Sequence, residues 1–162
     1  MIRCIALLLC VVWALGIDAA PLHADEDDYI RADRLGIAHI SMASDLTPLE
    51  RYQQALLLGA GWNRWPVYWN WVQPAVNVWD WSDYDRQVRY DLAHGLQINA
   101  ILLGVPDFYG DGDSIQGLNE PIFFDGTDDP ALGKAINPAN PWARFVYETV
   151  NRYKPGGELA TL

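Results

Sequence analysis

Residues 61–106 read GWNRWPVYWNWVQPAVNVWDWSDYDRQVRYDLAHGLQINAILLGVP. Two runs in this stretch, at 62–68 and 97–104, are rich in apolar, aromatic and β-branched residues, which favours β-strands. Between them, apolar residues recur at helical spacing over 82–95, and the closing glycine of that segment is typical of a helix end. A strand, a helix and a second strand in this order predict a parallel β-α-β unit.

The segments on either side repeat the same alternation. Upstream, LGIAHIS at 35–41 predicts a strand, and TPLERYQQALLLGAG at 47–61 predicts a helix that begins with a capping box and ends at one of its two later glycines. Downstream, a long polar loop occupies 107–140. Asn140-Pro141 then begins a third helix that runs to Tyr153.

Strands that alternate with helices about every 30 residues indicate an α/β fold. A closed TIM (β/α)8 barrel takes roughly 250 residues. We therefore expect 35–162 to form about three β/α units, the N-terminal part of such a barrel, truncated before strand four. The third strand is almost continuously apolar, which predicts burial on both of its faces. A small open α/β sheet is the alternative.

The first residues have the layout of a secretory signal peptide. A positive charge at Arg3 precedes an apolar run and then small residues, so we expect cleavage near Ala20 or Ala24. The apolar run is short for a membrane span, and an uncleaved anchor is the alternative. The expected organisation is a signal peptide at 1–24, an acidic segment at 25–34 and a partial (β/α)8 domain at 35–162, secreted from the cell.

The composition limits the classes of partner that we expect for the secreted chain. Both cysteines, Cys4 and Cys10, fall within the signal peptide, so the secreted part is expected to use neither disulfides nor thiol chemistry. The chain has 11 basic and 21 acidic residues, a net charge of −10. Such a surface repels nucleic acid and anionic membranes, so neither is expected as a partner after signal cleavage. Seven of the eight tryptophans follow the signal, and aromatic residues at this density build core or stack on sugar rings.

Motifs of several enzyme classes are absent from the sequence. It has no G-x-S-x-G, no Walker loop and no G-x-G-x-x-G. His39 and His94 stand alone, without the spacing of metal ligands. The DGDS at 111–114 suggests calcium, but Ile115 follows where an EF-hand loop needs another ligand. We expect neither a metal nor a cofactor.

The ordered features of 56–106 resemble the N-terminal third of the barrels of glycoside hydrolase clan A, such as families 5, 39 and 42. The features that match are Arg64 at the end of the second strand, Trp69 after it, the turn QPAVNVWDW at 73–81, Tyr84-Asp85 in the helix, and Pro106. The resemblance implies a carbohydrate substrate and, for the parent enzyme, retaining hydrolysis of O-glycosidic bonds. Two positions depart from the pattern: Asn77 replaces the usual glycine of the turn, and Asp107-Phe108-Tyr109 stands where a Trp is common.

Asn119-Glu120-Pro121 invites comparison with the catalytic acid/base of this clan. In these barrels an Asn-Glu pair ends strand four, after the third helix. Here the pair precedes the third helix, and the glycine-rich GDGDSIQG leads into it instead of an apolar strand. We therefore disfavour Glu120 as the acid/base. The resemblance places the catalytic carboxylates beyond Leu162, so we expect no catalytic residue in this chain.

The strand ends supply the candidate substrate-binding residues. The family places an arginine that orients the nucleophile at the end of strand two, which implies this role for Arg64; a salt bridge on the rim is the alternative. His39 follows the first strand and can donate to a sugar hydroxyl or pack in the core. The aromatic candidates are Trp69 and Trp71, with core packing as their alternative, and Phe108 and Tyr109 as subsite walls. A non-catalytic carbohydrate-binding relative and an unrelated small α/β domain are the alternative functions.

Overall fold

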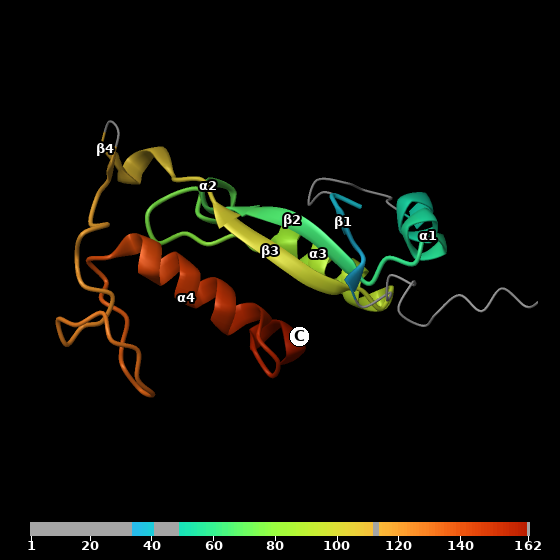
Figure 1. Cartoon of the computed structure of the whole chain (residues 1–162). Helices are drawn as coiled ribbons and strands as arrows, with labels where there is room; N and C mark the ends of the chain where they lie inside the picture. Colours follow the sequence, from blue (N-terminus) through green and yellow to red (C-terminus); the bar gives the residue numbers. More distant parts are fainter. Residues whose placement is uncertain (1–33, 41–48, 112–113, 162) are drawn as a thin grey trace, which may run out of the picture. The chain divides into compact units, whose positions relative to one another are not determined.

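Figure 1 shows the computed structural model of the chain, which describes residues 34–40, 49–111 and 114–161. These residues belong to the second of two units, Arg31–Leu162; the first, Met1–Ile30, contains the predicted signal peptide and lies outside the described residues. The elements are β1 (Gly36–Ala38), α1 (Leu49–Leu57), β2 (Trp62–Tyr68), α2 (Trp69–Val72), α3 (Ser82–Ala93), β3 (Gln97–Leu103), the 3-10 helix η3 (Asp107–Tyr109), β4 (Gly110–Asp111), β5 (Ser114–Ile115), α4 (Pro141–Tyr153) and the 3-10 helix η4 (Glu158–Thr161).

The three main strands form one parallel sheet in the order β1-β2-β3. In its register, Ala38 of β1 pairs with Arg64 of β2, which in turn pairs with Asn99 of β3. The prediction of three parallel strands in sequential order is confirmed, although β1 is shorter than expected. Within the described residues β1 and β3 are not paired with each other, so the sheet is open and does not close into a barrel.

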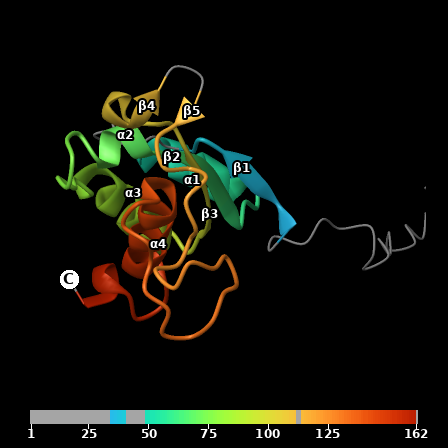
Figure 2. The same cartoon turned by 90° about the vertical axis from the view of Figure 1, so that its left-hand side faces the viewer.

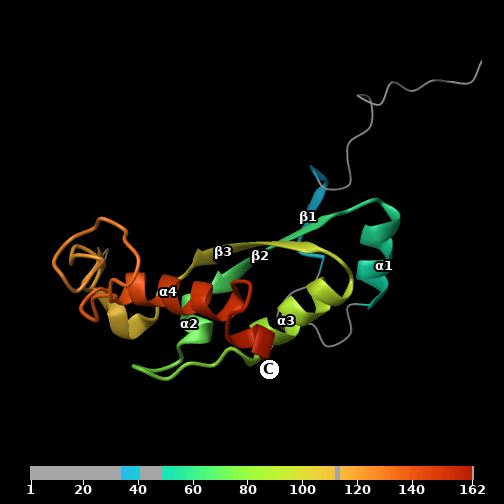
Figure 3. The same cartoon turned by 90° about the horizontal axis from the view of Figure 1, so that it is seen from below.

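The helices α1, α3 and α4 lie on one face of this sheet (Figure 1 and Figure 3). Side chains alternate between the two faces of a strand, and Asn63, Trp65 and Val67 of β2 point to the helical face and are buried. Arg64 and Asn99 point to the opposite face and are exposed. The prediction that β3 is buried on both faces is therefore wrong. Sequential strands joined by crossovers of one hand place their helices on one side, which leaves the other face open.

Two clusters of buried side chains hold the helices against the sheet. The larger joins β2 and β3 to α3 and α4, and Trp69 and Phe145 stack within it with ring centroids 5.4 Å apart. The smaller joins α1 to the end of β1 and the start of β3, and contains Tyr52, Ile40 and Leu96. The core thus lies entirely on the helical side of the sheet in the part of the chain that the structure describes.

The predicted ends of the first two long helices and the predicted start of the third are confirmed, whereas the predicted capping box that begins the first helix at Thr47 lies outside the described residues. α1 ends at Leu57, shortly before Gly59, and α3 ends at Ala93, shortly before Gly95. Both glycines have a positive φ, +82° and +70°, which is the usual backbone of a residue just past a helix. Asn140 caps α4, because its side-chain oxygen accepts a hydrogen bond from the backbone nitrogen of Ala143 at 2.9 Å.

The last turn of α4 is fastened to the first turn of α3. Arg152 Nε donates to Asp85 Oδ1 at 2.7 Å, and the Tyr153 hydroxyl donates to the same oxygen at 3.0 Å. Burial, together with the neighbouring Asp85 carboxylate, raises the pKa of Tyr153. The Arg152 guanidinium also lies over the Trp81 ring, and Trp81 stacks on Trp79 with ring centroids 5.6 Å apart.

The carboxylate of Asp91, on α3, is fully buried and accepts hydrogen bonds from α1 and β2. The Tyr52 hydroxyl donates to it at 2.6 Å, Asn63 Nδ2 at 2.9 Å and Trp65 Nε1 at 2.7 Å. Asn63 Oδ1 in turn accepts from the backbone nitrogen of Ile40 at 3.2 Å. This one carboxylate therefore connects two helices, the central strand and the chain that follows β1.

We expect Asp91→Ala to lower the free energy of unfolding by about 3–5 kcal/mol, because it leaves three buried donors without an acceptor. Urea-induced unfolding followed by circular dichroism measures this change. Asp83→Ala is the matched control: Asp83 lies on the same helix, but it is exposed and pairs only at the surface with Arg86. Its loss should change stability by at most about 0.5 kcal/mol. Equal losses in the two variants would contradict the central role of Asp91.

Candidate functional site

The C-terminal edge of the sheet is where parallel β/α folds place their binding residues. β2 passes directly into α2, a short helix that the sequence did not predict, and β3 leads through Gly104 into η3. A Cβ atom at Gly104 would lie 2.6 Å from Asn70 Oδ1, and φ at this glycine is +79°. The segments that follow β2 and β3 therefore touch at this glycine. The β4–β5 hairpin lies beyond the same end of the sheet, near α2 (Figure 1 and Figure 2).

His39, directly after β1, has a left-handed backbone with φ +59°, which is uncommon for a residue other than glycine. Its backbone nitrogen donates to the carbonyl oxygen of Arg64 at 2.9 Å, which holds this conformation at the sheet edge. The side chain is exposed, so His39 is not a core histidine in this structure. A backbone conformation of this kind at the end of a strand is consistent with a functional constraint. His39 stays a candidate hydrogen-bond donor to a ligand.

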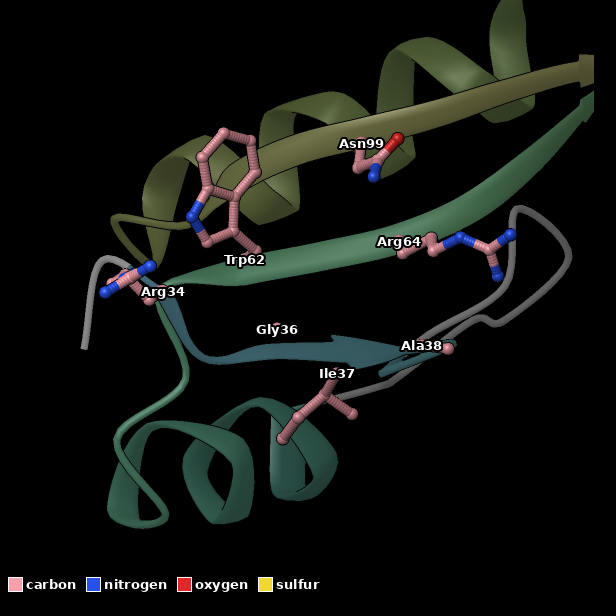
Figure 4. A pocket seen from close by; sticks show the side chains of 7 residues that line it. All are labelled: Arg34, Gly36, Ile37, Ala38, Trp62, Arg64 and Asn99. Carbon is pink, nitrogen blue, oxygen red and sulfur yellow. The ribbon is translucent and has the colours of Figure 1, made fainter. Parts of the chain in front are cut away.

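Arg64 lies on the open face of the sheet, and its side chain extends toward the end of β1 (Figure 4). The prediction that Arg64 ends the second strand is wrong, because Arg64 is the third residue of β2 and the strand continues to Tyr68. It makes no salt bridge with any residue that the structure describes. Asn99 lies beside Arg64 on β3 and was not among the predicted site residues. Aligning the two predicted strands in parallel would have identified Asn99 as the neighbour of Arg64. Both residues border a hollow of about 390 Å³, lined by Arg34, Gly36, Ile37, Ala38, Trp62, Arg64 and Asn99.

The two tryptophans that follow β2 have different environments. Trp69 has no exposed surface: it stacks on Phe145 and Tyr109, and its Nε1 donates to Gln73 Oε1 at 2.7 Å. Of the two roles that the sequence left open for Trp69, the geometry gives it core packing. Trp71 is 50% exposed and packs on Tyr68 with ring centroids 4.6 Å apart. Trp71 therefore presents an aromatic surface to solvent at the C-terminal edge.

Phe108 and Tyr109 form η3, directly after β3 and Pro106. Phe108 is 36% exposed and leans on Tyr109 with ring centroids 4.7 Å apart. Tyr109 is half-buried, since its other neighbour is the buried Trp69. Phe108 and Trp71 are thus the two sequence-predicted aromatic residues that a ligand can reach, and Tyr109 supports Phe108 from behind.

Glu120 lies at the end of a turn in the long loop, which follows the two-residue strand β5; no strand of the parallel sheet leads into it within the described residues. Its backbone oxygen accepts a hydrogen bond from Asn140 Nδ2 at 2.7 Å, so the capping residue of α4 also holds this turn. The side chain of Glu120 is exposed. This is the setting that the sequence predicted for it: a loop glutamate that precedes the third long helix.

The site offers stacking surfaces and hydrogen-bond donors, which suit a polar ligand with flat rings. Among the described residues, no group of three or more His, Cys, Asp or Glu side chains could hold a metal ion. In the same part of the chain, no helix is both long and apolar enough to cross a bilayer. No protein-family model matches the chain, and comparison with curated proteins and with solved structures finds no match.

The end of β2 is held by a buried tyrosine on α3. The hydroxyl of Tyr84 accepts a hydrogen bond from the backbone nitrogen of Tyr68 at 2.8 Å. Burial raises the pKa of Tyr84 from 10.0 to about 12. Because the phenol ionises less readily in the folded chain, its contribution to stability is complete below pH 10.0 and is lost as the pH rises toward about 12.

We therefore expect the urea midpoint to fall across this alkaline window, and Tyr84→Phe to show a shallower fall, because the variant has no phenol to ionise at this position. Tyr147→Phe is the control, since Tyr147 lies on the exposed side of α4; this variant should keep the wild-type slope. Identical pH dependence in wild type and Tyr84→Phe would show that the end of β2 does not depend on a neutral Tyr84.

Proposed function

We propose that this chain forms the first three β/α units of a secreted glycoside-hydrolase-like barrel and contributes part of its carbohydrate-binding surface. The observation that supports this best is the one-sided sheet. Its strands follow in sequential order with the helices on one face, as they do in the wall of a (β/α)8 barrel. A doubly wound fold instead covers both faces of its sheet with helices.

In this proposal the sugar binds along the C-terminal edge. Trp71, half exposed after β2, and Phe108, partly exposed after β3, provide apolar faces on which a pyranose ring can stack. Arg64 and His39 provide hydrogen-bond donors for its hydroxyls. Trp69 and Tyr109 act behind them, as the core that fixes the two loops in place.

The proposal assigns no catalytic role to this chain. Retaining hydrolysis needs an acid/base and a nucleophile whose carboxyl groups stand roughly 5–5.5 Å apart, and we place both on later strands of the parent barrel. Arg64 would then support the nucleophile from the first half of β2, level with the end of β1, in addition to contacting the sugar. A non-catalytic carbohydrate-binding protein would use the same edge. Sugar binding by this chain and hydrolysis by the parent enzyme are therefore tested separately.

Binding is tested with the full chain and neutral oligosaccharides, such as xylohexaose and cellohexaose, by isothermal titration calorimetry. We expect Trp71→Ala to weaken binding about tenfold or more, as expected for the loss of an aromatic anchor. Phe124→Ala is the matched control, because Phe124 is 73% exposed in the long loop and should leave affinity unchanged. Unchanged affinity in Trp71→Ala, or an equal loss in Phe124→Ala, would refute sugar stacking at this edge.

Catalysis is tested with aryl glycosides. We expect no release of the aryl group above the blank by this chain, and Glu120→Gln should bind oligosaccharides as the wild type does. Hydrolysis by the chain that Glu120→Gln abolishes would place the acid/base in the loop before α4, against the proposal.

A further inference from the structure

Two polar side chains that were not among the predicted site residues lie close to the exposed Trp71 at the C-terminal edge. Tyr68 is the last residue of β2, and Asn70 is exposed in α2, directly before Trp71. A Cβ atom at Gly104, just past β3, would lie 2.6 Å from Asn70 Oδ1 and 3.5 Å from Tyr68 Cδ1. The carboxamide and the phenol ring therefore lie over the same glycine, where α2 meets the C-terminal end of β3 (Figure 1).

Tyr68 is held in place, but its hydroxyl is available. Its backbone nitrogen donates to the Tyr84 hydroxyl at 2.8 Å, and its ring packs against Trp71 with ring centroids 4.6 Å apart. Side chains alternate along a strand, so Tyr68 points to the same open face of the sheet as Arg64. Neither the Tyr68 hydroxyl nor the Asn70 carboxamide makes a hydrogen bond with a residue that the structure describes. Both groups can therefore bond to a ligand at this edge.

The charge on the other side of Trp71 is negative. A small cavity there is lined by Trp71, Asp80, Ser82, Asp83 and Tyr84. The Asp83 carboxylate pairs with Arg86 at 2.6 Å, whereas Asp80 Oδ1 accepts hydrogen bonds from the backbone nitrogen and the hydroxyl of Ser82. These two bonds lower the pKa of Asp80, so its carboxylate is ionised at neutral pH. A negative charge at this position disfavours a ligand that brings a second carboxylate close to Trp71.

We propose that Tyr68 and Asn70 are two further sugar-binding residues, and that the subsite they form with Trp71 selects neutral pyranoses over uronic acids. The inference rests on the proposed carbohydrate-binding function and names its substrate class. A pyranose that stacks on Trp71 presents its hydroxyls around the edge of the ring. The Asn70 carboxamide can donate to one hydroxyl and accept from the next, and the Tyr68 hydroxyl can bond to a third. The Asp80 carboxylate provides the discrimination against acidic rings.

The role of the two residues is tested with cellohexaose, the full chain and isothermal titration calorimetry. Asn70→Ala and Tyr68→Phe should each weaken binding about threefold to tenfold, as expected for the loss of one or two hydrogen bonds. Tyr68→Phe keeps the ring that packs against Trp71, so its effect measures the hydroxyl alone. Gln54→Ala removes an exposed carboxamide from α1, and Tyr147→Phe removes an exposed phenol hydroxyl from α4. Both controls should bind as the wild type does, and circular dichroism checks that every variant folds.

The selection of neutral sugars is tested with cellohexaose oxidised at C6, which has the same linkages but carries carboxylates on its rings. At low salt it should bind at least about threefold more weakly than cellohexaose, and the difference should shrink at high salt. Asp80→Asn should raise the affinity for the oxidised form, because asparagine removes the charge and keeps an oxygen that can accept from Ser82.

Wild-type affinity for cellohexaose in either Asn70→Ala or Tyr68→Phe would overturn the inference, and so would equal affinity for the neutral and the oxidised ligand. If one of these results occurs while Trp71→Ala still weakens the binding of cellohexaose, the proposed function stands and only this inference fails. If cellohexaose does not bind, or binds without any dependence on Trp71, the proposed function itself fails.

Discussion

The buried carboxylate of Asp91 is the interaction on which the arrangement of the β/α units depends. It lies at the point where α1, α3 and β2 approach one another, and three donors converge on its two oxygens. Hydrophobic packing fixes how close these elements lie, but it is not directional. The hydrogen bonds to Asp91 fix their rotation and register, and through Asn63 they also fix the chain after β1, where His39 begins the candidate site.

The open face of the sheet follows from the same arrangement. With the helices on one side, the central strand has a buried row and an exposed row of residues. The exposed row contains an arginine opposite an asparagine, flanked by small residues on β1. Polar residues at these positions are stable because water reaches them. The same residues would need partners if the face were covered, so what covers or binds this face must match their charge.

The order and direction of the strands could be predicted from the sequence because they depend on local periodicity and on connection length. The ends of the helices could be predicted too, since Gly59, Gly95 and Asn140 act through their own backbone or side chain. Exposure could not. β3 reads as an apolar strand whether one face or both are covered, and Trp69 and Trp71 are chemically identical residues two positions apart. Only tertiary neighbours, Phe145 for one and Tyr68 for the other, separate core from surface. Asn99 was not predicted because it becomes a neighbour of Arg64 only through the register of β2 and β3.

The sequential order of the sheet also bears on how the chain acquires its structure. β2 and β3 each pair with the main strand that precedes them in the sequence, and α1 and α3 pack close to the strands that flank them. No part of this sheet has to wait for a distant strand to be synthesised. Each parallel pair must still close a crossover connection, such as the one between Trp62 and Gln97, before its hydrogen bonds form, and this entropy cost slows the folding of parallel sheets. Such a segment can assemble from its N-terminal end as it leaves the ribosome, and each completed unit presents an edge strand on which the next one forms.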